Sequence, residues 1–85
     1  MSKLKIFAVR DQAVDAFNRP FFSPSRGLAV RSFTDEVNRS DPANPMYAHH
    51  EEFVLYELGQ FDEETGIFET INPLIVCYAS SVAIR

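Results

Sequence analysis

Apolar and polar positions alternate most clearly over residues 53–71, and this pattern predicts a β-hairpin. The first arm, residues 53–61, is rich in aromatic and branched residues, which suit a pleated, half-buried surface. The second arm, residues 67–71, is shorter. Between the arms, Asp62 can accept hydrogen bonds from backbone amides ahead of it, and Gly66 can take the left-handed conformation that closes a tight turn. A two-stranded hairpin alone is marginal in water, so it needs another strand or a helix on its apolar face.

Two further stretches are predicted strands. Residues 3–10 are apolar on both faces over most of their length, which indicates a central strand that pairs with residues 53–61. Gly59 predicts a bulge or a tight backbone approach in that partner strand, which shifts the phase of Phe61. Residues 74–78 have high β-propensity and form a final strand.

Residues 25–38 follow a helical period and are predicted to form the one long helix. Ser23 or Ser25 can cap its start, and Asn38 marks its end. Gly27 weakens the first turn, so we expect either a close approach of another backbone there or a helix that begins one residue later. One apolar stripe runs along this helix at Ala29, Val30, Phe33 and Val37.

Four segments lack a clear period. Residues 11–17 are either a helical turn capped by Asp11 or an ordered loop, and the Phe21-Phe22 pair is either a short edge strand or a core plug. Residues 40–50 are a long loop, and residues 79–85 either extend the last strand or dock loosely.

Together these elements predict one α+β domain over residues 1–85. It consists of a small three- to four-stranded, mostly antiparallel sheet with one main helix packed on one face. The chain of 85 residues is too short for two independent cores, and its 46% apolar content rules against wholesale disorder. Because so small a core leaves a thin margin of stability, we expect a homodimer.

The net charge of −4 is unevenly spread along the chain. Residues 1–40 contain seven of the eight Lys and Arg residues against four acids, whereas residues 41–85 contain one basic residue against eight acids. Either one end of the molecule meets phosphates, or the two halves face each other within the fold or across a dimer.

Several classes of protein are disfavoured by composition. No apolar run approaches the ~20 residues that span a bilayer, and the N-terminus lacks the pattern of a signal peptide, so we expect no membrane association. Cys77 is the one cysteine and cannot form an internal disulfide, which fits a reducing cytoplasm and a small buried apolar residue.

Catalytic and metal-binding patterns are weak. His49 and His50 are neighbours that would point to opposite sides of an extended chain, with no third ligand at a recognisable spacing. The acids of residues 62–64 lie in a turn, where side chains are normally solvated. No nucleophile–base motif and no phosphate-binding glycine loop occurs, so we expect no enzyme activity, no cofactor and no metal.

Basic residues interleaved with aromatic ones are the candidate chemistry. An exposed Phe21 or Phe22 can stack on unpaired bases, although either ring could instead belong to the core. Nearby arginines and lysines can hold phosphates, and Arg10 could extend the patch. The sequence pI of about 5.0 disfavours non-specific duplex binding. The predicted DNA-binding residues are Lys3, Lys5, Arg19, Phe21, Phe22, Arg26 and Arg31.

Three blocks of sequence, in this order and spacing, support that chemistry by resemblance. They are residues 3–11, then Phe21-Phe-Ser-Pro with residues 27–35, then residues 55–62 with Thr65-Gly66. The pattern, over about residues 3–78, resembles the small non-structural protein of gokushovirus-like microviruses, which are phages with single-stranded DNA.

The resemblance implies a non-catalytic protein of the host bacterial cytoplasm that is absent from the capsid. It implies binding to single-stranded DNA and a role in the switch to single-strand synthesis or packaging. The alternative is a module that binds a phage or host replication or assembly protein without touching DNA.

Overall fold

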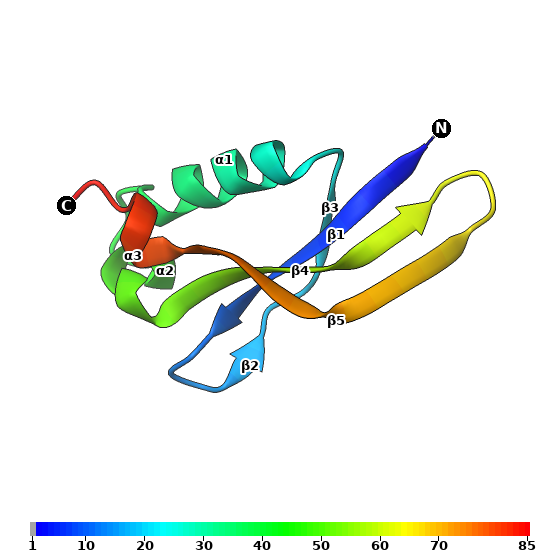
Figure 1. Ribbon diagram of the computed structural model, residues 1–85. Helices are drawn as coiled ribbons and strands as arrows, with labels where there is room; N and C mark the ends of the chain where they lie inside the picture. The colour runs from blue at the N-terminus through cyan, green and yellow to red at the C-terminus, as the bar shows by residue number, and fades with distance from the viewer. Residues whose placement is uncertain (1) are drawn as a thin grey trace.

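A curled antiparallel sheet with helices on one face forms two layers in the computed structural model, which describes residues 2–85 (Figure 1). The helical elements are α1 (Arg26–Val37), α2 (Pro45–Ala48), the short 3₁₀ turn η1 (His50–Glu52) and α3 (Ala79–Val82). The strands are β1 (Lys3–Asp11), β2 (Ala16–Phe17), β3 (Phe21–Ser23), β4 (Phe53–Asp62) and β5 (Ile67–Tyr78). The α+β class and the single main helix are as predicted, but the sheet has more strands than the expected three or four.

Strand order is β2-β1-β4-β5, and β3 pairs with β1 on the same side as β2. Strands β1 and β4 are therefore both central, as the sequence predicts. Strands β2 and β3 act as one edge strand that breaks at residues 18–20, where Pro20 has no N–H to donate. The opposite edge is the whole length of β5. In the part of the chain that the structure describes, no helix is long and apolar enough to cross a membrane.

Several boundaries of helices and strands differ from those predicted from local sequence propensity. Residues 67–71 and 74–78 are one strand, because Pro73 is tolerated where an edge strand has no outer neighbour. Residues 11–17 are neither a helical turn nor a loop throughout, since they contain a turn and the two residues of β2. The expected loop at 40–50 contains α2, and residues 79–82 form α3 instead of extending the strand.

Gly59 forms the expected bulge in β4. Ile6 lies opposite Gly59 and Phe7 lies opposite Glu57, so the ladder skips Leu58. Gly59 has φ of 143°, and a Cβ there would lie 2.1 Å from the carbonyl oxygen of Glu69. The bulge reverses the alternation of side chains along β4, so that the Phe61 side chain projects from the sheet face opposite to α1.

Helix α1 covers one face of the sheet at the end farther from the β4–β5 turn (Figure 1). Ser25 caps its start, because the Ser25 hydroxyl accepts a hydrogen bond from the Leu28 amide at 3.2 Å. Of the two explanations expected for Gly27, the close approach is wrong, since the nearest atom to an added Cβ there is the Ser25 hydroxyl at 4.0 Å. The other is confirmed, because the helix begins at Arg26, one residue later than residue 25. The core between helix and sheet contains Phe7, Val9, Ala29, Phe33, Val37, Phe53 and Leu55.

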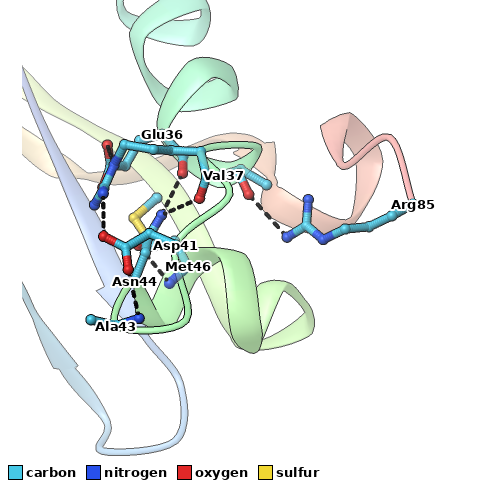
Figure 2. Close-up of polar contacts among 8 residues, drawn as sticks. Glu36, Val37, Asp41, Ala43, Asn44, Met46 and Arg85 are labelled. Atoms are coloured by element: carbon cyan, nitrogen blue, oxygen red, sulfur yellow. Dashed lines mark hydrogen bonds and ion pairs between the residues drawn. The ribbon is translucent and has the colours of Figure 1, made fainter.

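A polar cluster fixes the end of α1 against α2 and the C-terminus (Figure 2). The buried Asn44 side chain donates to the carbonyls of Glu36 and Arg39 and accepts from the Met46 amide. Arg85 donates to the Val37 carbonyl at 2.9 Å. These bonds satisfy carbonyls that the last turn of a helix leaves without partners.

Candidate nucleic-acid interface

The face of the sheet opposite α1 is lined by aromatic rings. Residues directly paired across an antiparallel ladder project from the same face. The pairs Ile6–Phe22, Leu4–Phe61 and Phe61–Phe68 place three phenylalanines on one side of the sheet. The pairs Arg10–Phe17 and Ala8–Tyr56 add two more rings. We call this surface the open aromatic face and define it by Phe17, Phe22, Tyr56, Phe61 and Phe68.

Three of these rings form one cluster. The ring centroids of Phe22 and Phe61 lie 5.7 Å apart, and those of Phe61 and Phe68 lie 4.8 Å apart. Phe22 is 47% exposed and Phe68 is 58% exposed. The bulge at Gly59 is necessary for this cluster, because without the skipped residue Phe61 would point toward the helix side.

The second pair of rings lies nearer the β1–β2 turn. Phe17 contacts Tyr56 edge to face with a centroid distance of 5.1 Å, and the Arg10 guanidinium lies 5.1 Å from the Phe17 centroid. Arg10 also forms an ion pair with Asp15. Arg19 lies just beyond Phe17, is exposed, and makes no side-chain hydrogen bond or ion pair among the residues that the structure describes.

The two predicted phenylalanines lie on opposite sides of the sheet. Phe22 belongs to the open aromatic face. Phe21 faces the helix side, where it stacks on Phe7 at 5.9 Å and packs against the core. The core interpretation therefore holds for Phe21 and fails for Phe22.

The predicted cations do not lie on the open aromatic face as a group. Lys3 and Lys5 alternate with the open-face residues of β1, so both project to the helix side, and Arg26 begins α1. Arg31 is exposed on α1, and Arg19 lies in the break between β2 and β3. Of these cations, Arg19 is the nearest in sequence to a ring of the open aromatic face, since it follows Phe17 by two residues.

Glu57 neutralises two of the predicted cations. Its carboxylate accepts from the Arg26 guanidinium at 2.7 and 3.1 Å and lies 3.5 Å from the Lys5 ammonium. Glu57 is only 7% exposed. Burial raises the pKa of Glu57, but the Arg26 hydrogen bond and the charges of Lys5 and Arg26 outweigh it and hold the pKa below its ordinary value. The two halves of the chain therefore face each other at this point of the fold.

The remaining candidates show structural roles. Within residues 2–85, no three His, Cys, Asp or Glu side chains gather to hold a metal ion. Asp62 accepts from the Glu64 amide and Gly66 adopts φ of 75°, which closes the hairpin as predicted. Burial raises the pKa of the Cys77 thiol, which makes it a poor nucleophile at neutral pH.

Sequence reasoning missed Phe17, Tyr56, Phe61 and Phe68 as site residues. Alternation along β4 was visible in the sequence, and so was the glycine that interrupts it. The pairing of β4 with β1 and β5, which brings these rings together with Phe22, was not visible there.

The fold and this surface define a small two-layer α+β protein with one sheet face left uncovered and aromatic. The chain belongs to the Phage ORF5 protein family, whose sequence model matches residues 4–82. No curated protein and no solved structure shows significant similarity to this chain.

Proposed function

We propose that this phage protein binds single-stranded DNA, without catalysis, through the open aromatic face. The exposed rings of Phe22 and Phe68 are the observation on which the proposal rests. Stacking of a base on an aromatic side chain contributes about 1–3 kcal/mol and tolerates any base sequence. A sheet that presents aromatic rings to unstacked bases is a recurrent solution for single strands. Paired bases keep their faces buried in the duplex, so this surface favours an unpaired strand.

Phosphate contacts have a smaller part in this proposal than the sequence suggested. The Arg10 guanidinium lies 5.1 Å from the Phe17 centroid and the exposed Arg19 follows Phe17 by two residues, so these two cations are expected to meet the phosphates of a strand stacked on Phe17. Lys5 and Arg26 are already paired with Glu57. Binding energy is therefore expected to come mainly from stacking.

The family match supports a phage protein, and the resemblance to microvirus non-structural proteins supports the biological role that we propose. A protein that coats unpaired phage DNA in the host cytoplasm would assist the switch to single-strand synthesis or packaging. It would act outside the capsid.

Fluorescence anisotropy with a labelled thymidine oligonucleotide tests the proposal. Phe22→Ala and Phe68→Ala should each weaken binding by roughly 5- to 100-fold, because each removes a stacking surface. Leu28→Ala, which shortens an exposed apolar side chain on α1, is the matched control and should bind like the wild type. Absence of binding by the wild type at low salt, or wild-type affinity of Phe22→Ala, would contradict the proposal.

A protein partner is the second candidate function. The net charge of −4 and the exposed aliphatic side chains of Ile71 and Leu74, which cannot stack on bases as rings do, favour it. A pull-down from infected cells that recovers a replication or assembly protein but no DNA would support this alternative.

A further inference from the structure

We propose that the outer strand β5 is the surface on which a second copy of this chain docks. Strand β5 forms one edge of the sheet, and among residues 2–85 no strand pairs along its outer side (Figure 1). Eleven large apolar side chains are exposed in the part of the chain that the structure describes, and six of them lie on β5. They are Ile67, Phe68, Ile71, Leu74, Ile75 and Tyr78.

These side chains project from both faces of the strand. Ile67 pairs with Asp62 and Leu74 pairs with Glu57, so both project to the helix side. Phe68 and Ile75 pair with Phe61 and Tyr56 and project to the open side. A ligand that lies on one face of the sheet would leave the other set exposed. A partner that lies along the edge contacts both sets at once.

The backbone of β5 also favours contact along the edge. An edge strand presents alternate N–H and C=O groups without partners, which another strand can satisfy. Pro73 and a shift of register between Thr70 and Leu74 interrupt β5 near its middle, and a second shift lies between Ile75 and Cys77. The first interruption leaves an arm on either side, residues 67–70 and 74–78. An antiparallel two-fold axis close to Pro73 would place the first arm of one copy beside the second arm of the other, in a closed contact.

Charge distribution argues for a second copy as the occupant. In a contact with two-fold symmetry, each copy presents the same patch, so a charged patch would repel itself. Each copy has a net charge of −4, but Glu69 is the one charged residue of β5, and its carboxylate accepts a hydrogen bond from Gln60. Two copies can therefore meet along β5, although both are acidic, because few like charges would face each other across the contact.

The available area fits a dimer of this size. At about half exposure, the five side chains other than Phe68, whose ring the proposed function needs for stacking, offer roughly 375 Å² per copy before the backbone is counted, which is nearly half of the ~800 Å² per partner in a standard interface. Such a contact would bring two open aromatic faces side by side, where one DNA strand could bind both copies. This extended DNA-binding surface rests on the proposed function, whereas formation of the dimer requires no DNA.

Sedimentation velocity of the full chain without nucleic acid, over a dilution series, tests the proposal. The wild type should sediment with twice the 9.7 kDa mass of one chain. Leu74→Lys should raise the dissociation constant at least tenfold, because it places like charges on both sides of the contact. Leu28→Lys makes the same change on α1 at similar exposure, 42% against 49%, and should leave the dimer intact. Circular dichroism checks that both variants are folded.

A wild type that stays at 9.7 kDa, or two variants with the same mass distribution, would overturn the proposal. Cysteine cross-linking provides the second measurement. In a Cys77→Ser background, mild oxidation should link Pro73→Cys into covalent dimers, because a residue at the two-fold axis faces its own copy, and should leave Leu28→Cys unlinked. A dimer in which Pro73→Cys does not cross-link would place the contact elsewhere and overturn the assignment. A dimer that binds no DNA would contradict the proposed function alone, and a monomer that binds DNA would contradict this inference alone.

Discussion

Two of the three glycines in the chain occupy positive φ, and their surroundings differ sharply. Gly59 has φ of 143° and lies against the backbone of β5, whereas Gly66 has φ of 75° at the tip of the hairpin with open space around it. Gly27 lies in the first turn of α1 with helical geometry and no close neighbour. Glycine is therefore required at position 59 by both its positive φ and the nearby backbone, and at position 66 by its positive φ alone. At position 27 neither reason applies.

Gly59→Ala should destabilise the fold by more than ~3 kcal/mol, because the new Cβ would collide with the Glu69 carbonyl in addition to the strain of positive φ. Gly66→Ala is the control that adds the strain alone and should cost about 1–2 kcal/mol. Urea denaturation followed by circular dichroism measures both. Equal losses for the two variants would show that the contact with β5 is unimportant.

Gly27→Ala should stabilise the protein by about 0.5–1 kcal/mol, because alanine has the higher helix propensity and nothing obstructs its methyl group. Thermal denaturation should show a rise in Tm of roughly 2–8 °C for a domain of this size. A lower Tm would indicate that Gly27 has a role outside helix formation.

At the scale of elements, buried polar side chains join segments that are distant in the sequence. Glu57 on β4 holds Lys5 of β1 and Arg26 of α1, and Asn44 joins the end of α1 to the start of α2. Each of these side chains has its hydrogen bonds satisfied by groups on a different element. Their loss should therefore loosen the packing of helix on sheet.

Glu57 makes stability depend on pH. Arg26 and Lys5 hold its pKa in the folded protein below its pKa in the unfolded chain, so its contribution to stability is fully present above the unfolded-state pKa and is lost as the pH falls through the folded-state pKa. Glu57→Gln should cost about 1–2 kcal/mol at neutral pH, a modest loss because Lys5 and Arg26 remain partly solvated. Denaturant titrations between neutral and acidic pH measure the difference, which should shrink on acidification. A difference that is independent of pH would contradict the ion-pair assignment.

Asn44→Ala should destabilise the protein by about 1–3 kcal/mol, because the Arg39 carbonyl and the Met46 amide would lose their partner and the Glu36 carbonyl would keep only its bond from the Arg39 amide. Asn18→Ala, at an exposed position in the break between β2 and β3, is the control and should change stability by less than about 0.5 kcal/mol. Chemical denaturation compares the two variants, and equal effects would show that the Asn44 cluster contributes nothing specific.

At the scale of the whole molecule, the two faces of the sheet have different chemistry. The helix side contains Lys3, Lys5, Arg26 and Arg31, but Glu57 neutralises part of this charge. The open side contains the rings, with Arg10 and Arg19 at one end. A ligand that follows the cations and a ligand that follows the rings would therefore occupy opposite faces.

Salt dependence distinguishes these two modes of binding. If a single strand stacks on the rings and meets about two cations, the logarithm of the binding constant should fall with the logarithm of salt concentration with a slope of about −1.4. Arg19→Ala should reduce that slope by about 0.7, whereas Arg31→Ala on α1 should leave it unchanged. Oligonucleotide titrations at several salt concentrations provide the slopes. A much steeper slope that falls with Arg31→Ala would place the strand on the helix side.

The sequence by itself determined the local elements. The hairpin with its turn at Asp62 and Gly66, the helix with its Ser25 cap, the central strand β1 and the bulge at Gly59 all depend on side-chain period and backbone preference over a few residues. These are properties of neighbouring positions, so they can be predicted without knowing what the segments pack against.

Only the tertiary structure decided which face each functional side chain occupies. Phe22 and Phe21 are neighbours in sequence but lie on opposite sides of the sheet, and Phe22 meets Phe61 and Phe68 only through the register of three strands. Glu57 accepts a hydrogen bond from Arg26, which lies 31 positions away in the sequence. Strand pairing sets these contacts, and a shift of one residue reverses the facing of every side chain, so local patterns could not specify them.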